Sequence, residues 1–233
     1  MMPKLFTNKA WDSDFFNRSI LTIDLDGFGG KVENWPKNSL ITVKVEADKY
    51  QRLAHINNHN FSFVEGELVF KKAMPVTASS TSLTDFNAYL ATESSIDELK
   101  LIVSDLYVNS RFREPWFTSL ERDRFYQKWI ENAVLAKFDD CCLVLKVENT
   151  ISGFVTVRIR GSEATIGLIG VATPFQGKGI GKQLLELVQN YSAAKKAKVI
   201  KVATQTSNIS AANLYGKNGF AIADISYWFY KKV

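Results

Sequence analysis

Residues 163–182 read EATIGLIGVATPFQGKGIGK, and this stretch decides the fold. An apolar run typical of a β-strand breaks into a loop with glycines at positions 177, 179 and 181, and a helix pattern follows. Glycine lets the backbone approach a ligand closely, and the first turn of a helix leaves several N–H groups unpaired. The stretch therefore predicts a strand, loop and helix that together hold an anionic group such as a phosphate.

Two common phosphate-binding loops do not match this stretch. A Walker A loop ends in Gly-Lys-Ser/Thr, whereas the chain reads Gly181-Lys182-Gln183. A dinucleotide fingerprint needs the spacing GxGxxG at the start of a βαβ unit, whereas these glycines alternate and further strands precede them. The loop is thus of another kind.

The composition indicates a folded protein with a substantial core. The 233 residues are 46% hydrophobic, which suffices for one large domain or two modest ones. The 29 Lys+Arg and 24 Asp+Glu residues give a net charge of +5 without long runs of like charge, which favours small anionic ligands over nucleic acid.

The same sequence predicts a cytoplasmic protein without a transmembrane segment. The N-terminal residues lack the apolar core of a signal peptide, and no window approaches the roughly 18 apolar residues that span a bilayer. Cys141 and Cys142 are adjacent in an apolar run, so their side chains face opposite sides of a strand and are expected to be buried, unbridged thiols. We expect no metal site.

A break in composition divides the chain. Residues 74–84, MPVTASSTSLT, are small and hydroxyl-rich and predict a linker between a small N-terminal α/β domain (1–73) and a second domain (85–233). In the first domain we expect a polar start, a glycine turn at residues 27–30, strands at 20–25, 40–45 and 61–70 and a helix at 48–57.

The second domain is predicted to combine helices with strands, three of which follow one another as an antiparallel meander. We expect helices from a cap at Ser94, at 120–137, at 180–196 and at 210–218. The strands are expected at 86–91, 141–147, 151–160, 165–171 and 199–205, with two short strands through Tyr230.

Two motifs resemble a known family. QGKGIG at 176–181 matches the Q/R-x-x-G-x-G/A motif of the GNAT acyl-CoA N-acyltransferases, between the fourth strand and third helix of that fold. The downstream pattern N-x-x-A-x-x-x-Y-x-x-x-G-F is met by Asn208, Ala211, Tyr215, Gly219 and Phe220. One departure concerns the path of the loop, because the family usually has proline where this chain has Thr173.

The resemblance implies a GNAT fold, in which helices flank a mixed, mostly antiparallel sheet, and an enzyme that uses acetyl-CoA. In the family, backbone groups at the end of the fourth strand bind the pantetheine arm, the loop amides bind the pyrophosphate, and the asparagine of the last helix touches the cofactor. On this chain these roles fall on Ile169, Val171, Gln176, Gly177, Lys178, Gly179, Ile180, Gly181, Asn208 and Tyr215. An ordinary strand-to-helix turn is the alternative for the loop.

Proton transfer needs an acid and a base. Tyr215 is expected to protonate the departing thiolate, with ordinary aromatic packing as the alternative. For the base, Glu65 is the first candidate, Glu67 and Glu163 are others, and a chain of water molecules would serve equally. His55 and His59 look like surface residues.

The acceptor is inferred from further resemblance. Residues 61–67, 110–116 and 125–134 are similar to family members that acetylate nucleotide-linked amino sugars, which implies the 4-amino group of dTDP-fucosamine, a dTDP-linked 4-amino-4,6-dideoxy sugar of the enterobacterial common antigen pathway. Arginine pairs with phosphate and aromatic rings stack on bases, which favours a substrate site at Arg111, Phe112, Arg113 and Trp116. Aromatic packing between two helices is the alternative.

Three functions remain open at this level. The first is a sugar-nucleotide N-acetyltransferase in which the amine attacks directly in a ternary complex. The others are a protein or peptide N-terminal acetyltransferase and a non-catalytic acyl-CoA sensor. The aromatic run from Tyr227 to Tyr230 is expected to serve the core or a homodimer seam.

Overall fold

The computed structural model of the chain describes residues 5–25, 32, 34–74 and 87–233. The chain divides into two units. The first unit comprises Met1–Leu68, Gln205–Ser207 and Asp224–Val233, and the larger unit comprises Val69–Thr204 and Asn208–Ala223. The predicted glycine turn and, apart from Met74, the predicted linker lie outside the described residues.

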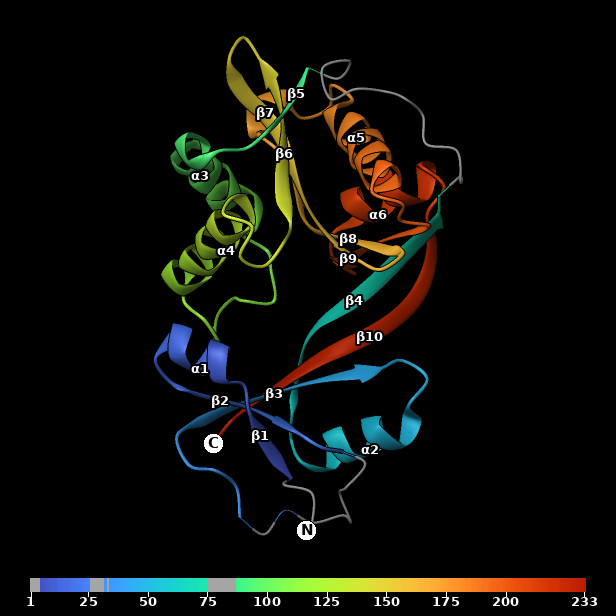
Figure 1. Cartoon of the computed structure of the whole chain (residues 1–233). Helices are drawn as coiled ribbons and strands as arrows, with labels where there is room; N and C mark the ends of the chain where they lie inside the picture. The colour runs from blue at the N-terminus through green and yellow to red at the C-terminus, as the bar shows by residue number, and fades with distance from the viewer. Residues whose placement is uncertain (1–4, 26–31, 33, 75–86) are drawn as a thin grey trace. The chain divides into compact units, whose positions relative to one another are not determined.

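The first unit is built on strands in the order β1-β2-β3-β10-β4 (Figure 1). Strands β2 and β3 run parallel, and β3 pairs antiparallel with β10. The elements are β1 (Phe6–Asn8), α1 (Ala10–Phe16), β2 (Ser19–Ile23), β3 (Ser39–Glu46), α2 (Tyr50–Asn58), β4 (Ser62–Ala73) and β10 (Ala221–Lys232). The last two strands are long and contribute residues to both units.

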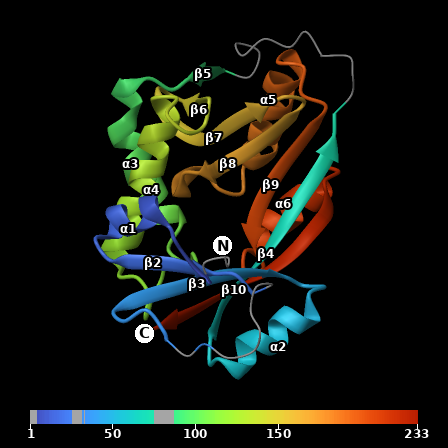
Figure 2. The ribbon, with the colours of Figure 1, turned by 60° about the horizontal axis from the view of Figure 1, so that its bottom comes forward.

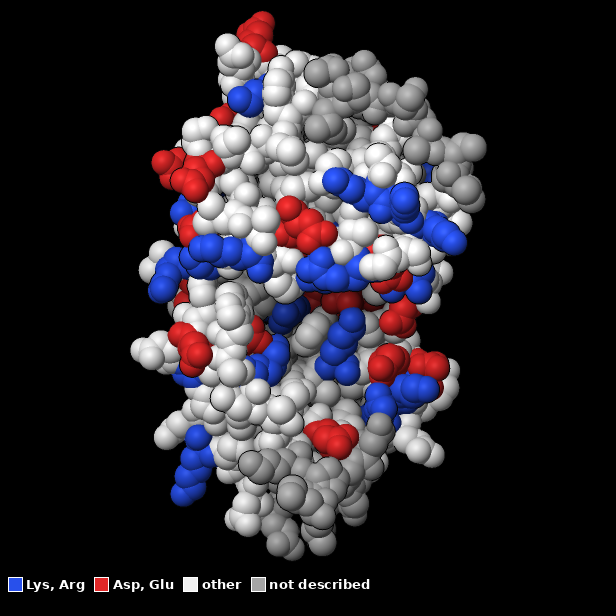
Figure 3. Space-filling model, viewed as in Figure 1, with Lys and Arg blue, Asp and Glu red and all other residues white. Residues whose placement is uncertain are grey.

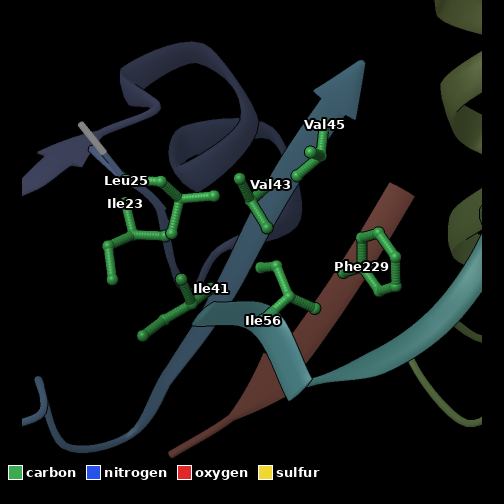
Figure 4. Close-up of a cluster of buried hydrophobic side chains, with 7 residues drawn as sticks. All are labelled: Ile23, Leu25, Ile41, Val43, Val45, Ile56 and Phe229. Atoms are coloured by element: carbon green, nitrogen blue, oxygen red, sulfur yellow. The ribbon is translucent and has the colours of Figure 1, made fainter. Parts of the chain in front are cut away.

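The core of the first unit lies between its strands and α2. Figure 4 shows seven apolar side chains that meet there, from β2, the residues after it, β3, α2 and β10: Ile23, Leu25, Ile41, Val43, Val45, Ile56 and Phe229. Tyr230, the last residue of the predicted aromatic run, is also fully buried. Two residues of this run therefore serve the packing of their own unit.

The larger unit is built on strands in the order β4-β9-β8-β7-β6-β5 (Figure 2). Strands β5 to β8 form an antiparallel meander, and β8 runs parallel to β9. The strands are β5 (Ala88–Leu90), β6 (Cys141–Val147), β7 (Thr150–Arg160), β8 (Glu163–Val171) and β9 (Val199–Gln205). The helical elements are η2 (Glu93–Ser95), α3 (Ile96–Leu106), α4 (Ser119–Val134), η3 (Thr173–Phe175), α5 (Ile180–Ala194) and α6 (Ile209–Lys217).

Helices cover both faces of the central strands. In Figure 1, α3 and α4 lie on one side of β6 and β7 and α5 lies on the other. The middle of each strand is accordingly buried without alternation, from Cys141 to Leu145 in β6 and from Ile151 to Val157 in β7. The unit is the predicted mixed, mostly antiparallel sheet flanked by helices.

Local signals fix where the helices begin. Helix α4 starts after a capping box in which the Thr118 hydroxyl accepts from the Glu121 N–H and the Glu121 carboxylate accepts from the Thr118 N–H. The predicted cap at Ser94 is wrong, because the capping box at that end is formed by Thr92 and Ser95 around η2.

Two further predictions are corrected. The polar start contains β1 and α1, and neither was expected. Helix α1 gives little local signal, because it is short, buries only Phe16 and has no side-chain cap. The predicted pair of short strands at the C-terminal end is one strand, β10, whose residues Ser226–Lys232 pair with β3. Among the described residues, no helix is long and apolar enough to cross a membrane.

Candidate active site

The site begins where strands β8 and β9 separate. Their parallel pairing runs from Glu163 opposite Val199 to Ile166 opposite Val202. A register shift in the β7–β8 ladder, between Val155 and Val157, lies at the same level and marks a bulge in β8. The remaining residues of β8 and β9 therefore border a gap in the sheet.

A cavity of about 860 Å³ occupies this gap. All of its walls belong to the larger unit: β8, the glycine loop, the end of β9, α6 and the last turn of α3. Its polar lining residues are Tyr107, Gln176, Lys182, Thr204, Asn208, Ser210, Asn213, Tyr215 and Lys217.

The backbone of β8 turns two N–H groups toward the cavity. Ala172 N donates to Ser152 O at 3.0 Å, and Gly170 lies opposite Phe154 in the β7–β8 ladder. Because backbone groups point to alternate sides along a strand, those of Ile169 and Val171 face away from β7. They face the side on which the pairing with β9 has ended.

The two carbonyl groups on that side already accept hydrogen bonds from side chains. The Tyr107 hydroxyl donates to Ile169 O at 3.1 Å, and the Gln176 amide donates to Val171 O at 3.2 Å. Gln176 thereby ties the glycine loop to the end of β8. The N–H groups of Ile169 and Val171 are left as the donors that a ligand in the cavity would meet.

The glycine loop supplies further donors. Gly177 and Gly179 have φ angles of 75° and 80°, in the left-handed region, and Gly179 caps the N-terminus of α5. Within the described part of the chain, no backbone N–H from residue 177 to residue 181 donates a hydrogen bond to another backbone group. These donors, with the positive end of the α5 dipole, suit an anion.

Tyr215 reaches the cavity from α6. Asn208 caps this helix by accepting a hydrogen bond from Ala211 N at 3.1 Å. The Tyr215 ring packs against Phe70 and Phe220, with centroids 5.3 and 6.0 Å away, and the residue is only 2% exposed. Burial raises the pKa of Tyr215, so its phenol stays protonated at neutral pH and can donate a proton.

A second tyrosine stands nearby on the opposite wall. Burial, and then the neighbouring Tyr126 and Tyr215, raise the pKa of Tyr107 well above its usual value. Its ring stacks on that of Tyr126 at 4.3 Å. Tyr107 is therefore a fixed, protonated hydrogen-bond donor in the cavity wall.

The comparison with known proteins agrees with this geometry. Residues 102–220 match the Acetyltransferase (GNAT) family. The chain belongs to the GNAT acetyltransferase family. It is 32% identical, over 226 residues that make up 95% of this chain and 96% of the relative, to dTDP-fucosamine acetyltransferase of Escherichia coli O6:H1.

Solved structures of GNAT proteins share the fold. A GCN5-related N-acetyltransferase from Sphaerobacter thermophilus superposes with a TM-score of 0.56 at 17% identity, covering 83% of this chain and 59% of that one. PaiA N-acetyltransferase from Thermoplasma acidophilum, in complex with coenzyme A, has a TM-score of 0.51 at 18% identity and covers 63% of this chain and 98% of its own. The predicted fold class is confirmed.

The three glutamates considered as bases in this GNAT enzyme have different surroundings. Glu163 pairs with Lys201 on β9, and Glu67 pairs with Lys44 and accepts from the indole of Trp228. Ion pairing makes both weaker candidates for a base.

Glu65 is a buried carboxylate of the first unit, 4% exposed. Its oxygens accept hydrogen bonds from Gly66 N at 3.0 Å, the Thr206 hydroxyl at 3.0 Å and the Ser207 hydroxyl at 2.9 Å. These bonds hold the carboxylate in one orientation.

The predicted substrate residues lie in the loop between α3 and α4. Phe112 is 4% exposed and packs on Phe125, with centroids 4.1 Å apart. This packing is the alternative given for Phe112, whose stacking on a base stays a prediction. The Arg111 guanidinium lies 4.1 Å over the Phe112 ring, and Arg113 donates to Ser110 O at 3.1 Å.

Neither cysteine lies in the cavity wall. Cys141 and Cys142 are free and buried, as predicted, and burial raises the pKa of both thiols. A buried thiol of raised pKa is a poor nucleophile at neutral pH. The described residues contain no group of three or more potential metal ligands.

Basic and acidic side chains are interspersed on the face of each unit that Figure 3 shows. Binding along a nucleic-acid backbone typically uses a continuous basic face instead.

Several cavity residues were not found from the sequence. Tyr107, Thr204, Ser210, Asn213 and Lys217 line the cavity, and the sequence singled out none of them as a site residue. Ser210, Asn213 and Lys217 lie on α6 beside the motif residues, so their helical spacing from those residues could have indicated them. Tyr107 carries no such signal, because it contacts a residue 62 positions away.

Proposed function

We propose that this acetyltransferase moves the acetyl group of acetyl-CoA to the 4-amino group of a dTDP-linked 4-amino-4,6-dideoxy sugar, in the cytoplasm and in the enterobacterial common antigen pathway. The similarity to dTDP-fucosamine acetyltransferase over nearly the whole of both chains supports this acceptor. A likeness confined to the GNAT domain would support acetyl transfer alone. A homodimer stays part of the proposal.

The opening between β8 and β9 is the observation that supports acetyl-CoA as the donor. The cavity offers the N–H groups of Ile169 and Val171 to an extended pantetheine arm, as an added strand would use them. The loop amides of residues 177–181 and Lys178 then lie where the pyrophosphate would bind. Acetyl-CoA supplies the acetyl group as a thioester.

The proposed reaction is a direct transfer. The neutral amine of the sugar attacks the thioester carbonyl carbon, a C–N bond forms, and the C–S bond breaks to release the CoA thiolate. Tyr215 protonates the thiolate, and the raised pKa of its phenol keeps that proton available. The Ile169 N–H stabilises the charge that develops on the carbonyl oxygen.

The proton lost by the amine needs an acceptor, and we assign it to Glu65, directly or through water. Arg111, Arg113 and Trp116 are proposed to bind the nucleotide part of the acceptor. Guanidinium groups bind phosphate well, and a face of the half-buried Trp116 ring would offer a stacking surface.

The proposal is tested by measuring release of the CoA thiol with acetyl-CoA and a panel of acceptors. We expect turnover with dTDP-4-amino-4,6-dideoxygalactose and little with the UDP-linked sugar or with peptides. Turnover with peptides alone would replace the acceptor with a protein N-terminus. Binding of CoA without transfer to any acceptor would indicate a sensor.

The role of Glu65 has its own test. We expect Glu65→Gln to lower kcat about 100-fold, since a positioned base contributes this much or more. The matched control is Ser207→Ala, which removes one hydrogen bond to the same carboxylate but keeps the charge. If both variants lose the same activity and the same thermal stability, Glu65 is structural.

A further inference from the structure

A chain of hydrogen bonds supports the bulge of β8 from the side of β7. The indole N–H of Trp129 on α4 donates to Asp139 Oδ2 at 3.2 Å, and the hydroxyl of Thr156 on β7 donates to the same oxygen at 2.7 Å. The backbone N–H of Leu168 then donates to the Thr156 hydroxyl at 2.8 Å. Asp139 and Thr156 are 1% and 0% exposed.

The direction of these bonds is determined by chemistry. A carboxylate only accepts hydrogen bonds, so the Thr156 hydroxyl turns its hydrogen to Asp139 and its lone pairs to Leu168 N–H. In a regular ladder that N–H would meet a backbone carbonyl of β7, and the register shift removes this partner. The hydroxyl replaces the missing carbonyl, which keeps a buried N–H satisfied.

The bulge residue is fitted closely to this pair. A Cβ atom on Gly167 would lie 2.4 Å from Asp139 Oδ2 and 2.8 Å from Thr156 Oγ1. Such distances exclude any side chain at position 167 unless the buried pair moves. The pair and the bulge are therefore packed as one unit.

One peptide group is held from both sides by this arrangement. The Leu168 N–H is fixed by Thr156, and the Ile169 carbonyl is fixed by Tyr107. The peptide between them carries the Ile169 N–H, which faces the cavity. These two side chains fix its direction together with the β7–β8 ladder, which resumes at Ile169 and Gly170.

We propose that Asp139 and Thr156 are positioning residues for acetyl transfer, which act by aiming the Ile169 N–H at the thioester oxygen. This inference rests on the proposed binding of acetyl-CoA in the cavity. Charge grows on the thioester oxygen as the amine attacks, so a misdirected donor loses more in the transition state than in the bound substrate. The effect falls mainly on kcat.

The test compares three variants of the full chain. Thr156→Val keeps the shape and removes the hydroxyl, Thr156→Ser restores it, and Thr42→Val makes the same change at a buried strand threonine of the first unit. Acetyl-CoA and dTDP-4-amino-4,6-dideoxygalactose are the substrates. The readouts are kcat, KM, the melting temperature and the Kd values of CoA and acetyl-CoA.

We expect Thr156→Val to lower kcat about 10- to 100-fold, because a displacement of about 1 Å at a reacting group costs up to about 100-fold. The Kd of CoA changes less than about threefold, Thr156→Ser stays near the wild type, and Thr42→Val keeps its kcat at a comparable loss of melting temperature. A folded Thr156→Val variant with the wild-type kcat overturns the inference. A Thr156→Ser variant whose kcat falls as far as that of Thr156→Val also overturns it.

Two arms keep the outcome decidable. Should Thr156→Val not fold, Asp139→Asn replaces it, and an unchanged kcat there overturns the inference. If the wild type does not acetylate this acceptor, the proposed acceptor is wrong, and the positioning role is then tested by the Kd values of acetyl-CoA and CoA. Thr156→Val must weaken the binding of acetyl-CoA, which has the thioester carbonyl, more than the binding of CoA. Equal weakening of both overturns the inference.

Discussion

Among single residues, Tyr215 carries the sharpest prediction. Tyr215→Phe keeps the ring against Phe70 and Phe220 and removes only the proton donor. We expect kcat to fall about 100-fold, with the Kd of CoA and the melting temperature unchanged. Because burial raises the pKa of Tyr215, the wild-type rate should show no loss from deprotonation of this group up to about pH 10, the usual tyrosine value.

A matched control exists on α5. Tyr191→Phe removes a phenol from a tyrosine that lies outside the cavity lining and whose hydroxyl contacts Cys141. Thiol release should continue at the wild-type rate in this variant. A Tyr215→Phe enzyme that is as active as Tyr191→Phe would remove Tyr215 from the mechanism.

The sequence identifies some of these residues and not others, for a physical reason. Asn208 and Tyr215 lie seven residues apart on one helix, so their spacing alone places both on its cavity side. Thr156 and Asp139 act only through their approach to the bulge, which depends on the register of two strands. The apolar pattern does not show where a bulge inserts its extra residue and shifts that register. The burial of Phe112 also escapes a local reading, since its ring packs on Phe125 of α4 as well as on Phe117 of its own loop.

Among elements, the glycine loop is tested by two equal substitutions. Gly179 and Gly161 have φ angles of 80° and 58°, and no atom lies within 4 Å of a Cβ built at either position. Replacing either glycine with alanine should therefore lower the free energy of unfolding by about 1 kcal/mol, through backbone strain alone. Only Gly179→Ala should raise the Kd of CoA, about tenfold as measured by calorimetry, because Gly161 lies in the β7–β8 turn.

An equal change in the Kd of CoA in both variants would show that the loop acts through stability only. No change in either would move the pyrophosphate away from residues 177–181. Binding of the adenosine part alone serves as the internal reference, because it does not use the loop amides.

The pairing of α3 with α4 gives a prediction for pH. Glu131 on α4 accepts hydrogen bonds from Lys100 on α3 and Lys128, which lower its pKa to about 2. A carboxyl whose pKa is lowered on folding stabilises the protein above its unfolded pKa and loses this effect as the pH falls through the folded value. Glu131→Gln should thus cost about 1 kcal/mol at pH 7, allowing for solvent screening.

Urea unfolding at several pH values measures this difference. The wild type and Glu131→Gln should converge as the pH falls from 4.5 toward 2. A difference that is constant over this range would mean that the glutamine disturbs packing instead. Lys128→Gln is the control within α4, since it leaves the link to Lys100 intact.

Element prediction succeeds where turns bound an apolar strand and fails where the local signal is weak. Strands β6 and β9 have the predicted bounds, because their apolar runs are ended by turns. Helix α1 has seven residues and one buried side chain, so its stability comes from contacts that the local sequence does not reveal.

For the whole molecule, the C-terminal strand shows what a local reading omits. The structure places Asp224–Val233 in the first unit, where Tyr227 pairs with Val45, whereas the sequence assigned these residues to the second domain. Such pairing joins residues that are far apart in the chain and follows from topology, not from composition.

Amide hydrogen exchange can distinguish the binding of the two substrates. Every residue that lines the cavity belongs to the larger unit, so acetyl-CoA should slow amide hydrogen exchange in β8, the glycine loop and α6 while leaving β2 and β3 unchanged. At 100 times its Kd a ligand adds about 2.7 kcal/mol, which corresponds to about 100-fold slower exchange where opening requires its release. dTDP should instead protect residues 110–116 of the larger unit. Protection by acetyl-CoA without any by dTDP would retain the acetyltransferase and overturn its nucleotide-sugar acceptor.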